Sequence, residues 1–272
     1  MVRKCVRTVT VLTRGCDDDA MSEHTGSGGP GGTAQAEHEL LHEATQRLVR
    51  TVDGLSDEEL AGPSLLPGWT RAHVVAHLAL NAEGLAAALE GVGHGEDVPM
   101  YASQEARDGD IAALAAEGPV ELRERLLAST TRFAEALAAL PEDRAGTRVE
   151  RTPGGPTFRA ASAAGMRWRE VEIHHADLDA GYGPGDWPLP FSVATLTAMT
   201  TPGATKARDW GAPFAVHAVD AQRTWTVGEG EPSTTVSGAA CDLAWWLTGR
   251  GAGAGLHTDD GGHGELPSVP PW

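Results

Sequence analysis

Residues 39–55 read ELLHEATQRLVRTVDGL. The apolar side chains in this stretch recur at steps of three and four, at Leu41, Ala44, Leu48, Val52 and Leu55. This spacing places them on one face of an α-helix and leaves the charged residues on the opposite face. The stretch therefore predicts an amphipathic helix that buries one side against other helices.

Three further regions have the same character. Thr70 is a favourable N-cap for a helix over residues 71–90, which we expect to end in the glycine-rich run that follows. Helical patterns also cover residues 111–118 together with 120–140, and residues 160–180. Helices of this length joined by short connections predict an antiparallel four-helix bundle.

The pattern changes after the last of these helices. Residues 183–190 are rich in Gly and Pro and predict a linker. Beyond a helical stretch at 193–198, three short β-rich segments separated by turn residues predict strands at 214–219, 223–227 and 233–237. Residues 241–248 predict one more helix, and an extended loop is expected at 148–158, within the bundle region.

The fold class predicted from these segments is α+β. We expect a disordered N-terminal tail at 1–35, a helical bundle at 36–185, a small α/β domain at 190–256 and a flexible tail at 257–272. Met21 precedes a flexible Gly-rich tract, so translation could begin there instead of at Met1.

Composition excludes several classes of function. The 272 residues carry 21 Lys and Arg against 38 Asp and Glu, a formal net charge of −17. Such a balance argues against binding to nucleic acid and to anionic membranes, both of which need clustered positive charge. The three cysteines, Cys5, Cys16 and Cys241, form no disulfide or zinc-thiolate pattern, and we expect free thiols in a cytoplasmic protein.

Histidine and carboxylate side chains recur on two of the predicted helices. His73, His77 and Asn81 are spaced four apart, and Glu170, His174 and Asp177 follow at steps of four and three. Each set therefore shares one helix face. One Glu and two His would hold zinc with one coordination position open, which is typical of a catalytic site. In such a site Asp177 could accept a hydrogen bond from a ligand imidazole.

Simpler interpretations stand beside this one. A Glu four residues before a His is common in helices by chance, and His73 could be a partly exposed polar residue. Glu172 and His175 are expected to be solvated or paired, and His217 to be a buried histidine with its hydrogen bonds satisfied. His257 and His263 lie in the expected tail, where a ligand role is disfavoured.

Two longer motifs carry a family resemblance. Residues 65–79 read LLPGWTRAHVVAHLA, continuing with NAEGL at 81–85, and residues 166–178 read MRWREVEIHHADL. Both resemble the mycothiol-dependent maleylpyruvate isomerases, which belong to the DinB-like group of metal-binding four-helix bundles. The segment LAWWLTGRG at 243–251 matches the C-terminal part of that family more loosely.

The resemblance implies a zinc site, a thiol co-substrate and a reaction. Carried onto this chain, the zinc ligands are His77, Glu170 and His174, with Asp177 as an acidic neighbour behind them. Arg250 corresponds to an arginine that lies near the substrate. Mycothiol would add as a thiolate to maleylpyruvate and leave after rotation, giving fumarylpyruvate. We expect a monomer that uses small molecules only.

Two other functions stay open at this point. Related bundle proteins look like zinc-dependent S-transferases that conjugate mycothiol to electrophiles, and the chain could also be a metal- or ligand-binding module without catalysis. Fold alone does not separate them.

Overall fold

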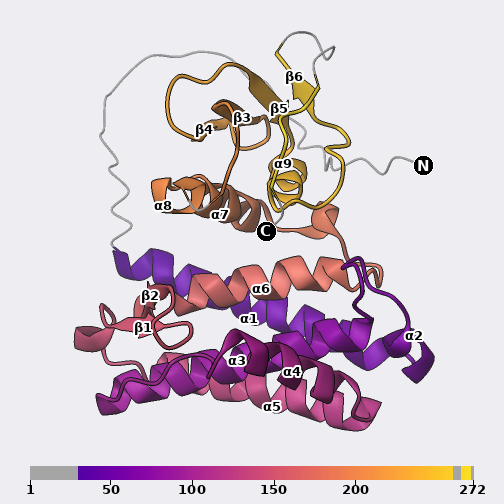
Figure 1. Cartoon of the computed structure of the whole chain (residues 1–272), viewed down its shortest axis with the longest axis vertical. Coiled ribbons are helices and arrows are strands. Elements are labelled where there is room, and N and C mark those ends of the chain that lie inside the picture. Colours follow the sequence, from indigo (N-terminus) through magenta and orange to yellow (C-terminus); the bar gives the residue numbers. More distant parts are fainter. Residues whose placement is uncertain (1–29, 207, 260–264, 271–272) are drawn as a thin grey trace, which may run out of the picture.

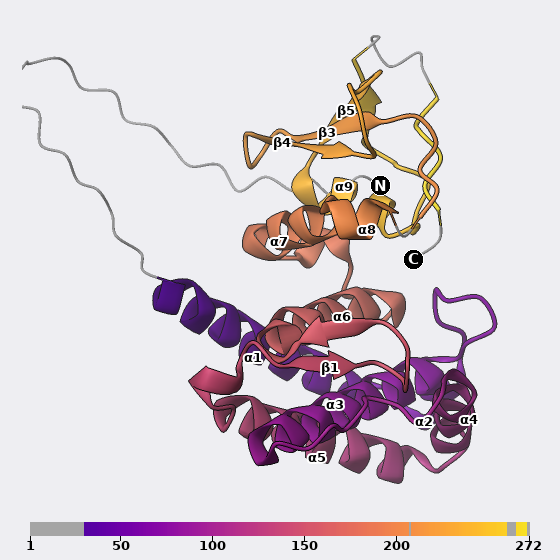
Figure 2. The same cartoon turned by 60° about the vertical axis from the view of Figure 1, so that its left-hand side comes forward.

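The computed structural model describes residues 30–206, 208–259 and 265–270. Figures 1 and 2 show two halves, a helical bundle and a smaller half above it that contains a sheet. The bundle elements are α1 (Pro30–Gly54), α2 (Asp57–Ala61), α3 (Arg71–His94), α4 (Gln104–Ala115), α5 (Pro119–Ala138), β1 (Arg148–Glu150), β2 (Thr157–Arg159) and α6 (Ala163–Asp177). The smaller half contains α7 (Leu189–Met199), α8 (Pro202–Lys206), β3 (Phe214–Ala218), β4 (Arg223–Val227), β5 (Thr235–Gly238), α9 (Ala240–Leu247) and β6 (His257–Thr258).

Helices α1, α3, α5 and α6 form the predicted bundle, so the α+β fold class is confirmed. The apolar stripe of α1 is buried, with Leu48 and Val52 fully inaccessible. By length and composition alone, α3 is apolar enough to cross a membrane. However, 67% of its most apolar 18-residue stretch is buried inside the protein. Its hydrophobicity is therefore that of a core helix.

Helix α3 begins as predicted and ends later. Thr70 caps it by accepting a hydrogen bond from the His73 amide. The helix continues through Gly91 to His94 and ends at Gly95, which adopts the left-handed conformation with φ of 80°. Gly91 lies against Val98, where a Cβ would come within 2.6 Å of the valine side chain. Gly91, which suggested an earlier end of the helix, is thus needed for close packing against Val98.

The region between α5 and α6 differs from the prediction. Residues 148–158, expected as an extended loop, lie almost entirely within the antiparallel hairpin β1–β2, in which Val149 is opposite Phe158. The last bundle helix begins at Ala163, after a 3₁₀ turn at Ala160–Ser162, and ends at Asp177 rather than near residue 180.

The smaller half contains a four-stranded sheet in the order β4-β3-β5-β6. β3 and β5 are parallel and the other neighbours are antiparallel. Figures 1 and 2 show α7 and α9 between this sheet and the bundle, with α6 below them. The join between the two halves is therefore made by helices.

Both predicted tails need correction where the structure describes them. α1 begins at Pro30, so residues 30–35 are helical; residues 1–29 lie outside the described residues. At the other end, β6 pairs with β5 through His257 and Thr258, which places these residues in the sheet and not in a flexible tail. The partner strand is distant in sequence, so the local Gly-rich composition gave no sign of the pairing.

Candidate metal centre

His77 occupies the inward face of α3, where only 4% of the residue is exposed. Its Nε2 atom lies 2.8 Å from Glu170 Oε2. Trp69, just before the helix, presents its ring 5.8 Å from the imidazole in an edge-on arrangement. Burial lowers the pKa of His77 to about 4, so its imidazole is neutral at physiological pH.

Glu170 and His174 approach from α6, one helical turn apart. His174 Nε2 lies 3.3 Å from Glu170 Oε2. The rings of His77 and His174 are 4.6 Å apart and nearly perpendicular. One donor atom from each of the three residues lies within 4.8 Å of the others. The structure thus brings together the side chains that the resemblance pointed to.

The three residues fit a zinc ion by chemistry and spacing. Two imidazoles and one carboxylate form a catalytic type of zinc donor set, and tetrahedral ligands about 2.1 Å from zinc are roughly 3.5 Å from one another. Although burial opposes ionisation of Glu170, hydrogen bonds from His174 and His77 hold its pKa well below the usual value. The carboxylate is therefore anionic and available as a ligand.

Asp177 connects this cluster to the smaller half of the molecule. Its carboxylate is fully buried and lies 2.8 Å from His174 Nδ1. Arg250, which follows α9, donates to both Asp177 oxygens, from Nε and Nη2, at 2.8 Å each. Although burial opposes the charged carboxylate, these partners lower the pKa of Asp177. Two of the Arg250 donors are thus directed at Asp177 in this arrangement.

Arg107 is a neighbour that the sequence did not reveal. It extends from α4, and its Nη2 lies 3.1 Å from His77 Nδ1. Its guanidinium also lies over the Tyr101 ring, 5.7 Å from the centroid. No spacing rule connects α4 with α3, since their contact depends on how the intervening loop folds. A guanidinium can only donate, so His77 Nδ1 accepts here and Nε2–H faces Glu170.

Comparison with known proteins identifies the family. Residues 41–179, about half of the chain, match the mycothiol maleylpyruvate isomerase N-terminal domain. The chain belongs to this family. The match spans the bundle from α1 to the end of α6 and includes His77, Glu170 and His174.

Family members of known structure cover both halves of this chain. The crystal structures of the mycothiol-dependent maleylpyruvate isomerase and of a histidine-to-alanine variant each superimpose with a TM-score of 0.78 and 29% identity. They cover 88% of this chain and 97% of their own. Uncharacterized proteins from two strains of Mycobacterium tuberculosis are 30% identical over 222 residues, covering 78% of this chain and 84% of theirs.

His73 and Asn81, the other polar residues on the His77 face of α3, contact residues outside the His–Glu–His cluster. His73 lies at the start of α3, where its Nδ1 is 2.7 Å from Thr70 Oγ1 in the cap. Asn81 Oδ1 accepts a hydrogen bond from Arg167. Neither belongs to the His–Glu–His cluster, although both share the helix face of His77.

Glu172 and His175 are buried and paired, which rules out the solvated alternative of the expectation and agrees with the paired one. Glu172 is fully inaccessible and bonds to Arg47 and to the Tyr182 hydroxyl. His175 is 1% exposed, stacks on Tyr182 at 3.9 Å between centroids, and lies 2.8 Å from Thr51 Oγ1. They form a second polar cluster on the α1 side of α6.

Among the described residues, the remaining histidines and Cys241 are not part of the His–Glu–His cluster. His217 is half-buried rather than buried, with Nδ1 2.9 Å from Thr224 Oγ1. His257 is in β6, and His263 lies outside the described residues. Cys241 is buried in α9. Cys5 and Cys16 also lie outside the described residues.

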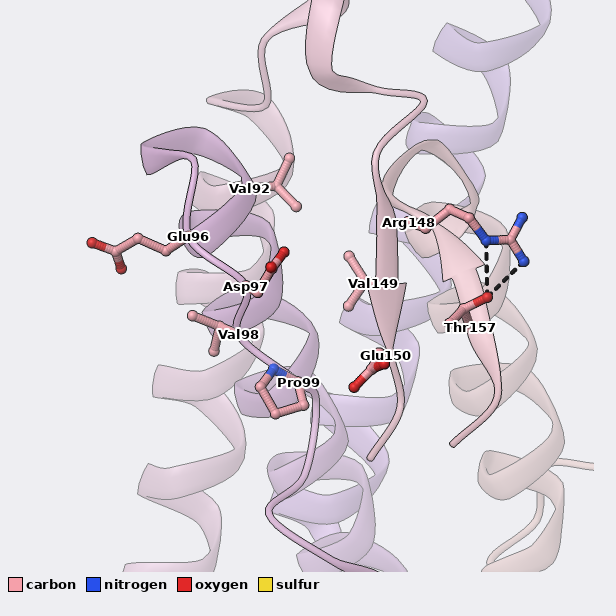
Figure 3. Close-up of a pocket in the computed structure, with 9 residues that line it drawn as sticks. All are labelled: Val92, Glu96, Asp97, Val98, Pro99, Arg148, Val149, Glu150 and Thr157. Carbon is pink, nitrogen blue, oxygen red and sulfur yellow. Dashed lines mark hydrogen bonds between the residues drawn. The ribbon is translucent and has the colours of Figure 1, made fainter. Parts of the chain in front are cut away.

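A separate hollow of about 280 Å³ lies between the end of α3 and the β1–β2 hairpin (Figure 3). Arg148 is held there by two hydrogen bonds to Thr157 Oγ1, at 3.0 and 2.6 Å. Figure 3 shows Glu96 pointing away from the hollow and Val149 pointing from β1 toward it. The residues drawn do not converge on one point, so the His–Glu–His cluster is the better candidate for function.

Proposed function

We propose that this protein is a zinc- and mycothiol-dependent cis–trans isomerase that converts maleylpyruvate to fumarylpyruvate. The observation that carries the proposal is the convergence of His77, Glu170 and His174 from two helices of a family member. Coverage of both halves by structures of an isomerase supports the same reaction class. We further propose that the protein acts as a cytoplasmic monomer.

The protein's own residues would prepare the cluster for a cation. Zinc held by His77, Glu170 and His174 would stabilise the thiolate form of a bound thiol near neutral pH. His77 presents a neutral imidazole because burial lowers its pKa to about 4. A ligand at its Nε2 needs that lone pair, so Arg107 must then release Nδ1. Asp177 orients the His174 ring through Nδ1.

The proposed reaction returns the thiol and involves no net redox change. The mycothiol thiolate adds to the cis double bond of maleylpyruvate, and the electron pair of that bond moves toward the conjugated carbonyl as an enolate. The carbon–carbon bond is then single and rotates. When the enolate re-forms the double bond, the thiolate leaves and fumarylpyruvate is released. Arg250 would bind a carboxylate or stabilise the enolate through guanidinium hydrogens other than the two that it donates to Asp177, or after releasing one of those two.

The reaction is tested by incubating the zinc-loaded protein with maleylpyruvate, with and without mycothiol, and following ultraviolet absorbance. We expect isomerisation only when the thiol is present, with no change in thiol concentration. Turnover without thiol would contradict the mechanism. A stable thioether would instead identify an S-transferase, and zinc binding without any turnover would indicate a binding module.

The ligand set is tested by His77→Ala. We expect stoichiometric zinc to be lost, because Glu170 and His174 alone hold a cation poorly. His73→Ala is the matched control, since His73 lies one turn away on the same helix and bonds within the cap. Elemental analysis should find zinc in the control only. Full zinc in His77→Ala would show that the ligands are wrong.

A further inference from the structure

A second cavity lies in the bundle between α1 and α5, with a volume of about 520 Å³, within the ~300–1,000 Å³ range of small-molecule sites. Its walls are mostly apolar, and one arginine from α6 reaches it. It is lined by Leu41, Val49, Leu127, Phe133, Ala134, Leu137 and Ala138, by the polar residues His38, His42, Thr45, Gln46, Arg50, Thr130 and Thr131, and by Arg167. The metal-centre residues are not part of this lining.

The charge of this cavity is opposite to that of the whole protein. The chain carries 38 Asp and Glu and a net charge of −17, yet none of the lining residues is acidic. The charged residues in the lining are Arg50 and Arg167. Thr130 and Thr131 direct their hydroxyls to the carbonyl of Leu127, one helical turn back. The cavity therefore offers positive charge within apolar walls.

Arg167 is buried and incompletely bonded. The residue is 1% exposed, and its Nη1 donates to Leu78 O at 2.8 Å and to Asn81 Oδ1 at 2.9 Å. Its Nη2 is buried and has no hydrogen-bond partner among the described residues. Burial lowers its pKa only to about 10, so the group stays charged at neutral pH. A buried charged donor without an acceptor is costly, which calls for an acceptor from outside the chain.

We propose that the α1–α5 cavity binds an aliphatic monocarboxylate, whose carboxylate accepts a hydrogen bond from Arg167 Nη2 and whose chain lies along the apolar walls. A carboxylate supplies the missing acceptor, and its negative charge adds to that of Glu170, which already favours the charged guanidinium. The aliphatic part suits walls built mainly from Leu, Val and Ala. Of the described residues that line this apolar cavity, Arg167 is the one buried cation, so the ligand that fits best has one anionic group at the end of an aliphatic chain.

Binding is tested with decanoate, decanol and decylammonium by isothermal titration calorimetry on the full chain, with no mycothiol or maleylpyruvate present. We expect decanoate to bind one per chain and decanol to bind at least about tenfold more weakly, because a hydrogen bond to a charged group is worth roughly 1.5–3 kcal/mol. Decylammonium should be weaker still, although the net charge of −17 favours cations. Equal affinity for decanoate and decanol would overturn the proposal.

Three variants separate the cavity from other surfaces. Ala134→Trp fills the cavity from an exposed position on α5 and should abolish decanoate binding. Ala128→Trp is the matched control, because Ala128 is exposed on the same helix but outside the cavity. Arg167→Met should lower the affinity for decanoate to that for decanol. If this variant does not fold, the loss of decanoate binding in Ala134→Trp is the test of the proposal.

Two results would reject the proposal outright. No heat of decanoate binding at either of two temperatures would mean that decanoate does not bind and that Arg167 Nη2 does not recruit a carboxylate. A change of sedimentation coefficient in Ala134→Trp but not in Ala128→Trp would mean that the cavity is a contact between copies of the chain. Because these titrations use neither substrate nor thiol, neither result bears on the isomerase proposal.

Discussion

Asp177 is the residue through which both halves of the molecule reach the candidate metal centre. It lies between His174 on α6 and Arg250 after α9, with all three contacts at 2.8 Å. Asp177 is fully buried and Arg250 is partly exposed, so removal of Arg250 leaves the Asp177 charge with His174 as its partner, whereas removal of Asp177 takes a partner from both. Substitutions at this point therefore separate a role in substrate binding from a role in holding the zinc ligand.

Arg250→Ala should keep zinc but lower kcat/KM at least about tenfold, because one hydrogen bond from its guanidinium to a charged substrate group is worth roughly 1.5–3 kcal/mol. Elemental analysis and steady-state kinetics with maleylpyruvate check both parts. Arg223→Ala is the control, since Arg223 is exposed on β4 and stacks on Trp225. Unchanged kinetic constants would show that Arg250 does not contact the substrate. Loss of zinc would show that Arg250 instead positions Asp177, which contacts the ligand His174.

His175, which follows the candidate ligand His174 but contacts Thr51 of α1, provides a pH-dependent prediction. Burial and the nearby Arg47 lower its pKa from 6.5 to about 3 in the folded protein. The stability that follows from a lowered histidine pKa is complete above pH 6.5 and falls as the pH approaches the folded value. The loss is about 1.4 kcal/mol per pH unit below 6.5.

We therefore expect the stability advantage of the wild type over His175→Gln to shrink by about 2 kcal/mol between pH 7 and pH 5. Urea unfolding of both proteins at pH 5, 6 and 7 measures the difference, and taking the difference cancels groups common to both. An advantage that stays constant across this range would show that His175 is not held neutral.

Among the elements, α3 and α6 position the candidate site. α3 begins at a capped turn seven residues before His77, and α6 carries Glu170 and His174 one turn apart. The cap at Thr70 satisfies the amide of His73, one of the helix-terminal donors that have no partner within the helix. The start of α3 thus sets where His77 lies along the bundle.

Thr70→Ala should lower the free energy of unfolding by about 1 kcal/mol, the usual cost of losing an N-cap side chain. Thr131→Ala is the control, because Thr131 is exposed inside α5 and its hydroxyl returns to Leu127 O. Denaturant unfolding should place this control within about 0.5 kcal/mol of the wild type. A Thr70→Ala protein as stable as the control would contradict the capping argument.

At the scale of the whole molecule, one hydrophobic core runs through both halves. Trp187, after α6, packs on Phe191 of α7 at 5.0 Å and on Trp245 of α9 at 5.6 Å between centroids. Phe191 in turn contacts Trp168 of α6 at 5.2 Å. Aromatic side chains of both halves thus bury one another, and the Asp177–Arg250 pair lies at the same join.

The two halves should therefore unfold in a single transition. Tryptophan fluorescence and far-ultraviolet circular dichroism are expected to give coincident curves in urea, the mark of two-state behaviour. Trp187→Ala should separate the curves by weakening the join. Two distinct transitions in the wild type would show that the halves are energetically independent.

Local periodicity in the sequence was enough to predict the bundle helices, the Thr70 cap and most strands of the sheet, because these depend on residues close together in the chain. It also placed Glu170 and His174 on one helix face, while His77 was selected through the family resemblance. Contacts between distant segments were decided only by the tertiary structure. They include β6 on β5, Arg107 on His77, the burial of Glu172 and His175, and the cavity at Arg167. These partners are far apart in sequence, and which of them meet depends on how whole elements pack, which no spacing within one element records.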